Sequence, residues 1–192
     1  MKEYGSLKQG NLEGNCGMYA LFNALYLLNH DGAMDFDIDE VYQRVIKKID
    51  KNLISYTKIL SDGMTYRHLY ETLKYIVNEI NTVKKDSYNI FLRKTGKELV
   101  GKRKETIIND MKKFLHNTDN RIIVLGVDGI YNHWTCVRDV TDLNLLVADS
   151  SVFESGRIPI KKIKIIKASE DKQFYCIYPQ NMLYLERVYI DE

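Results

Sequence analysis

The sequence is poor in the residues that mark linkers, repeats and cross-linked folds. Only two of its 192 residues are proline and three are cysteine, and no Gly-rich or Ser-rich tract interrupts it. We therefore expect one domain over residues 1–192, without linker, repeat or low-complexity segment. The cysteines, Cys16, Cys136 and Cys176, form no CxxC pair. This spacing disfavours a disulfide framework or a zinc ribbon and leaves at least one thiol free.

Two further absences bear on location and partners. No apolar run approaches the roughly 18 residues needed to span a bilayer, and the first residues lack the apolar region of a secretory signal. We therefore expect a cytoplasmic protein with no membrane partner, although delivery to another cell without a leader stays open. The formal charge of +2 is too small to demand a nucleic-acid partner, and none is expected.

Helical periodicity dominates the first two thirds of the chain. After Asn15, a candidate N-cap, apolar residues recur at helical spacing from Met18 to Leu28 and occupy most of the other positions. A helix that is apolar nearly all round is buried. The segments 37–49 and 65–80 are amphipathic and follow helix-start signals, and 105–115 is a shorter candidate.

From Asn120 the pattern changes to short runs rich in β-branched and aromatic residues, separated by turn residues. The predicted strands are RIIVLGV, HWTCVRDV, LNLLVADS, FYCIYP and LYLERVYI. We expect a mainly antiparallel sheet with the N-terminal helices packed on one face, which is an α+β fold. The segments 29–37, 81–104 and 150–158 are expected to be loops that set specificity.

Cys16 lies at the start of the first predicted helix, followed by Gly17. The free backbone N–H groups and the positive end of the helix dipole favour the thiolate there, which is the nucleophilic form of cysteine. Glycine on both sides, at Gly14 and Gly17, would let a substrate approach the backbone closely. Taken alone, however, a free cysteine is more often a small buried hydrophobic residue.

His133 and Asp149 complete a possible catalytic group with Cys16. His133 opens the strand HWTCVRDV, and Asp149 ends the next predicted strand after the turn TDLN. A hairpin of this length would return Asp149 to His133, where its carboxylate can orient the imidazole while the other ring nitrogen faces a thiol. Gln9 could join the Cys16 backbone N–H in stabilising an oxyanion, although by itself it is typical of a solvated loop.

These motifs, in the order glutamine, NCG, HW and LLVADSS, resemble the papain-like cysteine peptidase superfamily. Within it, the chain is most similar to the bacteriocin-processing peptidases that cleave after double-glycine leaders. The segment SDGMTYRHLYETLKYI also resembles the second helix of that group. The resemblance implies a papain-like fold and a peptide or protein substrate. It implies that Cys16 is the nucleophile, His133 the general base and acid, Asp149 the orienting residue and Gln9 the oxyanion donor.

Two other functions stay open, and so does the oligomeric state. Transglutaminase-like and deamidating proteins share the order Cys, His, Asp with an HW strand, so acyl transfer on a protein glutamine is one alternative. A catalytically silent binding module on the same fold is the other. Metal ligation by Cys16, His133 and Cys136 is disfavoured because zinc sites usually show closer local pairs, and no cofactor is expected. The basic run 93–104 is expected to be a solvated loop.

Overall fold

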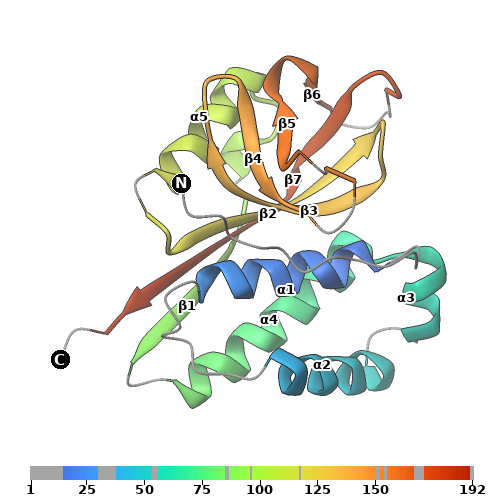
Figure 1. Cartoon of the computed structure of the whole chain (residues 1–192), viewed down its shortest axis with the longest axis vertical. Coiled ribbons are helices and arrows are strands. Elements are labelled where there is room, and N and C mark those ends of the chain that lie inside the picture. The colour runs from blue at the N-terminus through green and yellow to red at the C-terminus, as the bar shows by residue number, and fades with distance from the viewer. Residues whose placement is uncertain are drawn as a thin grey trace.

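A computed structural model of the chain combines helices with a mainly antiparallel sheet, as the sequence predicts for an α+β protein. It describes residues 15–29, 38–52, 56–84, 87–95, 97–116, 118–149, 152–153, 155–166 and 171–190. Figure 1 shows a group of helices below the sheet and a further helix, α5, beside its upper part. Within the described ranges, every helix is too short or too polar to cross a bilayer.

The predicted helices are present, with shifted ends and one addition. The α-helices are α1 (Cys16–Leu28), α2 (Ile38–Asn52), α3 (Tyr56–Asp62), α4 (Tyr66–Val83) and α5 (Lys104–Leu115). Short 3-10 helices span Lys97–Leu99 and Ile160–Lys162. The sequence did not predict α3, which has only seven residues and is too short to show a clear period.

The sheet has the strand order β1-β7-β2-β3-β4-β5, and β6 pairs in parallel with β7. The strands are β1 (Tyr88–Lys94), β2 (Arg121–Gly129), β3 (His133–Val140), β4 (Asn144–Ala148), β5 (Arg157–Pro159), β6 (Ile163–Ile165) and β7 (Tyr175–Tyr189). Strands β2, β3 and β4 match the predicted segments. All pairs other than β6 with β7 are antiparallel.

Strand β7 corrects the prediction of two strands separated by a turn at PQN. It is one strand of 15 residues, and the turn residues lie within an irregular stretch of it. Leu125 pairs with Met182 whereas Val127 pairs with Ile177, so that residues 178–181 lie opposite Gly126 alone. Such a bulge contains turn-forming residues without reversing the chain.

Strand β1 corrects the prediction that residues 81–104 form a loop. It pairs with β7 from Tyr88 opposite Tyr189 to Lys94 opposite Leu183. The basic run 93–104 is a loop only in part, since its first two residues end β1, a 3-10 helix spans Lys97–Leu99 and its last residue begins α5, but most of its described residues are exposed as predicted. The partner strand lies about a hundred residues away in sequence, so no local pattern could reveal the pairing.

Helices cover both faces of the sheet, and the prediction of one covered face was wrong. Helices α1 and α4 pack on one face, against a core that includes Ile122, Val124 and Cys136. Helix α5 packs on the opposite face, where Ile107 and Met111 join a second core. Alternate residues of a strand point to opposite faces, and β2 is buried on both sides for this reason.

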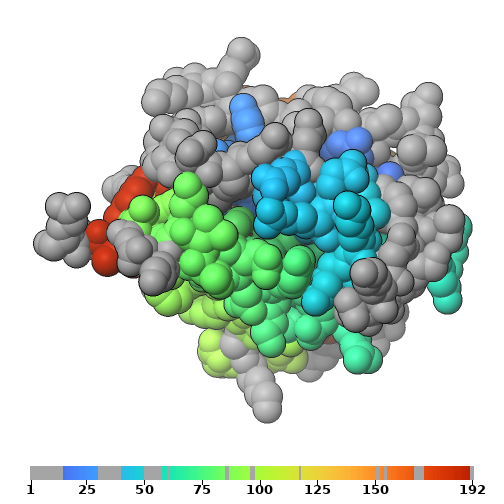
Figure 2. Space-filling view, turned by 90° about the horizontal axis from the view of Figure 1, so that it is seen from below, coloured from blue at the N-terminus to red at the C-terminus, as the bar shows by residue number. Residues whose placement is uncertain are grey.

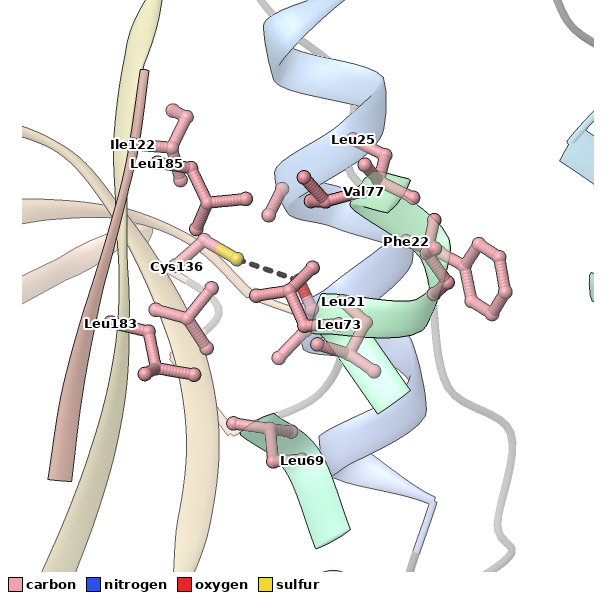
Figure 3. Close-up of a cluster of buried hydrophobic side chains, with 14 of the residues drawn as sticks. Leu21, Phe22, Leu25, Leu69, Leu73, Val77, Ile122, Cys136, Leu183 and Leu185 are labelled. Carbon is pink, nitrogen blue, oxygen red and sulfur yellow. Dashed lines mark hydrogen bonds between the residues drawn. The ribbon is translucent and has the colours of Figure 1, made fainter. Parts of the chain in front are cut away.

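Helix α1 lies between the sheet and α4 (Figure 3). Leu21 and Leu25 are completely buried there, and the Cys136 thiol donates a hydrogen bond to the Ala20 carbonyl at 2.9 Å. Figure 2 shows α2 and α4 side by side on the outer surface of the helical layer. Asn15 occupies the N-cap position of α1, but its side chain makes no capping hydrogen bond.

The burial of α1 predicts a large difference between two leucine substitutions. Leu25→Ala should lower the free energy of unfolding by about 2–5 kcal/mol, because it leaves a cavity between the sheet and α4. Leu143→Ala is the matched control, since that side chain is 75% exposed in the β3–β4 turn and should change stability by less than about 0.5 kcal/mol. Urea unfolding measures both values, and equal losses would contradict the buried position of α1.

Candidate active site

The first residue of α1 is Cys16, and its thiol is free and partly exposed. Most of the helix behind it is buried, from Gly17 to Leu28. The backbone N–H groups of Gly17 and Met18 follow Cys16 in the first helical turn and have no carbonyl acceptor inside the helix, whereas the Tyr19 N–H already donates to the Asn15 carbonyl. The thiol is therefore accessible at the positive end of a helix that packing holds in place.

His133 and Asp149 are hydrogen-bonded, as the hairpin length predicts. The distance from His133 Nε2 to Asp149 Oδ1 is 2.8 Å. Strand β4 runs antiparallel to β3, with Ala148 opposite Cys136, so the chain returns Asp149 to the beginning of β3. His133 is 6% exposed and Asp149 is 3% exposed. Little solvent competes for this hydrogen bond.

Asp149 is held as a carboxylate by several donors. Burial raises the pKa of Asp149, but hydrogen bonds from His133, the Phe153 backbone N–H and the Thr135 hydroxyl outweigh burial and lower the pKa below its ordinary value. The Phe153 N–H lies 3.0 Å from Oδ2, the oxygen that does not contact His133. Both carboxylate oxygens therefore have partners, which fixes the direction of the group.

His133 also contacts Cys16. Burial lowers the pKa of His133, but hydrogen bonds to Asp149 and Cys16 and the negative charges of both outweigh it, and the pKa rises to about 9. Because Asp149 occupies Nε2, the ring nitrogen left for the thiol is Nδ1. The structure thus brings together three of the four residues that the sequence singled out. Gln9, the expected oxyanion donor, lies outside the described residues.

Met64 contacts both halves of this group, which the sequence did not predict. It precedes α4, and its backbone carbonyl accepts a hydrogen bond from Trp134 Nε1 at 2.8 Å. A Cβ atom on Gly17 would lie 2.9 Å from the Met64 Cβ. The glycine after Cys16 and the tryptophan after His133 are therefore both explained by Met64. The only sequence signal for this contact was their position beside the candidate residues.

Aromatic side chains pack on the other side of His133. The Phe153 ring lies edge-on to the imidazole, with 6.0 Å between centroids. Tyr131 and Tyr175 contact Phe153 and each other. Phe153 belongs to the segment 150–158 that the sequence assigned to a loop, so its double contact with His133 and Asp149 was missed.

The described residues do not favour a metal site. Across the part of the chain that the structure describes, no three His, Cys, Asp or Glu side chains are arranged to hold a metal ion. Cys136 is fully buried in the core and its thiol donates to Ala20, on the opposite side of β3 from His133. Burial raises the pKa of Cys136, which disfavours the thiolate that a metal would need.

No protein-family model matches this chain, and no curated protein matches it significantly. The geometry of the site is therefore the basis on which a function can be argued.

The close contact between Gly17 and Met64 predicts that Gly17→Ala is destabilising. Alanine is the better helix former by about 1 kcal/mol, so an unconstrained position would gain stability. Here the new methyl group must displace Met64, and we expect a net loss of about 1–3 kcal/mol. Urea unfolding gives the value. Asn78→Ala on the exposed side of α4 is the control for helix propensity, and a gain at Gly17 would contradict the contact.

Proposed function

We propose that this chain is a papain-like cysteine hydrolase that cleaves a peptide or amide bond. Cys16 is the nucleophile, His133 the general base and acid, and Asp149 the residue that orients His133. The observation that carries the proposal is the position of His133, whose imidazole is hydrogen-bonded to Asp149 through Nε2 at 2.8 Å and lies close enough to Cys16 for the thiol to raise its pKa. A buried imidazole between a carboxylate and an accessible thiol is the arrangement that nucleophilic catalysis requires.

In the first half of the reaction, the Cys16 thiolate attacks the carbonyl carbon and the carbonyl oxygen takes the negative charge. The backbone N–H groups at the start of α1 are suited to stabilise this oxyanion. The C–N bond then breaks, the His133 imidazolium donates its proton to the leaving amine, and a thioester remains on Cys16. In the second half, water attacks the thioester while His133 accepts one of its protons, and the C–S bond breaks to release the carboxylic acid and restore the Cys16 thiolate beside the His133 imidazolium.

The alternatives differ from this proposal at separate steps. Acyl transfer to an amine shares the first half and differs only in the group that attacks the thioester. A binding module needs no nucleophile at all. The buried pair of His133 and Asp149 argues against that module, since replacing such a pair with apolar residues is often neutral or stabilising. The role of Asp149 in orienting the imidazole gives a reason for the buried pair.

The first test of the proposal is whether cleavage depends on Cys16. A peptide library prepared from a digested proteome is incubated with the protein, and new peptide ends are identified by mass spectrometry. We expect cleavage by the wild type and none by Cys16→Ala, with His133→Ala nearly as inactive, because loss of the nucleophile or its base removes the chemistry. Asp149→Asn should leave a measurable remainder, since it orients the base without reacting.

Cys176→Ala is the matched control, because Cys176 is also a free cysteine but is completely buried away from His133. It should cleave as the wild type does. Cleavage that survives in Cys16→Ala would refute the proposal, and incorporation of a labelled primary amine in place of cleavage would move the assignment to acyl transfer.

The raised pKa of His133 predicts the pH dependence of cleavage. Below pH about 9 the imidazole is protonated and can donate to the leaving amine. As pH rises through about 9 this proton is lost, so kcat/KM should fall on the alkaline side. In Asp149→Asn the carboxylate charge that helps to raise the pKa is absent, and the alkaline fall should move to lower pH. The same alkaline limb in both proteins would exclude His133 as the titrating group.

A further inference from the structure

Five cations from two separate segments gather where α5 begins. They are Lys102, Arg103, Lys104, Lys161 and Lys162, which we call the basic cluster. The first three lead into α5, and the last two belong to the 3-10 helix that starts at Ile160. The Lys104 ammonium donates a hydrogen bond to the Ile160 carbonyl at 3.4 Å, which brings the two segments together.

No described residue forms an ion pair with any of these five cations. By contrast, Lys112 on α5 and Lys164 on β6 are each paired with an aspartate. All members of the basic cluster except Lys104 are exposed, and they outnumber the two acidic residues of the same stretch, Glu98 and Glu105. Because the five cations exceed the formal charge of +2 of the whole chain, the rest of the chain is net negative. The cluster is a local concentration of positive charge.

The stability of α5 does not explain the cations at its start. Arg103 occupies the N-cap position with an extended backbone, and its side chain makes no capping hydrogen bond. Short polar or acidic residues are preferred there, because they accept hydrogen bonds from the free N–H groups. The positive end of the helix dipole also repels cations. The charge at this helix start therefore lowers the stability of α5, which favours a role in binding.

Exposed apolar side chains border the basic cluster. Leu143 is 75% exposed, and its carbonyl accepts a hydrogen bond from the Ile160 N–H at 2.9 Å, so the β3–β4 turn lies against the cluster. Val100 is 47% exposed and lies in the turn in which the Lys102 N–H donates to the Leu99 carbonyl. A partner that fits this surface combines negative charge with apolar groups.

We propose that the basic cluster binds a segment of the protein substrate that contains acidic and apolar residues, at a distance from the bond that Cys16 attacks. The inference rests on the proposed function, because it names the substrate class of that site. A short acidic segment fits better than a membrane or a nucleic acid. Either of those would extend beyond the cluster towards the net negative rest of the chain, which repels it.

Strand β4 relates the basic cluster to the candidate active site. Leu143 precedes this strand of five residues and Asp149 follows it, so the two are about 20 Å apart at roughly 3.3 Å per residue. An extended peptide needs about six residues to cover that length. The acidic segment is therefore expected about six or more residues from the cleaved bond.

The first experiment measures binding without turnover. The Cys16→Ala protein is titrated into a short fluorescein-labelled peptide of glutamate and leucine, and fluorescence anisotropy gives the Kd. The same peptide with glutamine in place of glutamate is the control for charge. We expect the acidic peptide to bind roughly tenfold more tightly than the neutral one and to lose this advantage at high salt. Equal affinity for the two peptides would overturn the inference.

Two double variants, each made in the Cys16→Ala protein, locate the binding surface. Lys161→Gln with Lys162→Gln should weaken binding of the acidic peptide roughly tenfold, since each exposed ion pair contributes a factor of a few. Lys47→Gln with Lys48→Gln is the matched control, because these consecutive exposed lysines lie on α2, at the opposite end of the molecule from β5 and β6 (Figure 1). The control changes the net charge equally and should leave the Kd unchanged. An equal loss in both would overturn the inference.

Arg103→Asp separates binding from folding. Aspartate suits the N-cap position and the helix dipole, so Tm should not fall, whereas binding of the acidic peptide should weaken severalfold. Unchanged binding would contradict the role of the cluster. Phosphatidylserine-containing vesicles and a single-stranded oligonucleotide are titrated in parallel. Tighter binding of either one, lost in Lys161→Gln/Lys162→Gln, would overturn the assignment to an acidic protein segment.

The last experiment tests the link to cleavage in a library of long proteome fragments. Where cleavage depends on Cys16, aspartate and glutamate should be enriched about six or more residues from the cleaved bond. The enrichment should disappear in Lys161→Gln/Lys162→Gln while cleavage continues. Cleavage that depends on Cys16 without enrichment would refute the acidic substrate and leave the hydrolase intact. Absence of cleavage would refute the hydrolase, and the peptide titration would decide separately whether the cluster binds acidic segments.

Discussion

The burial of α1 is the constraint on which the other parts of this structure depend. A helix with apolar side chains on nearly every face has no side to present to water, so it must be covered on one flank by the sheet and on the other by α4. The single partly exposed position at its start is Cys16. Any movement of the Cys16 backbone would require the helix to move, which the close packing of the core resists.

The pair of His133 and Asp149 imposes a second constraint, because charge is costly to bury. The structure offsets this cost by giving each polar atom of the pair a partner. Asp149 receives the Phe153 N–H as well as His133, so the chain after β4 has to fold back over the carboxylate. The Phe153 ring then covers the imidazole. Phe153 therefore satisfies the carboxylate with its N–H and shields one side of the imidazole with its ring.

Local patterns predicted the parts of the fold that depend on neighbours in sequence. The buried helix after Asn15 and the hairpin that joins His133 to Asp149 were both predicted, because their periodicity and turn lie within short windows. The pairing of β1 with β7 was not predicted, because paired residues such as Phe91 and Glu186 lie far apart in the sequence. The run PQN was taken for a turn, although neighbouring strands hold it as a bulge. In both cases distant contacts overrode the local signal.

The site shows the same division between near and distant contacts. Cys16, His133 and Asp149 could be chosen from the sequence because their chemistry is distinctive and their elements are regular. Met64 has no such chemistry, yet its carbonyl binds Trp134 and its side chain leaves room only for glycine at position 17. One residue thus fixes the sheet, which carries the imidazole, against the helix, which carries the thiol. A catalytic group divided between two layers needs such a contact, because a shift of about 1 Å between them is enough to slow the reaction strongly.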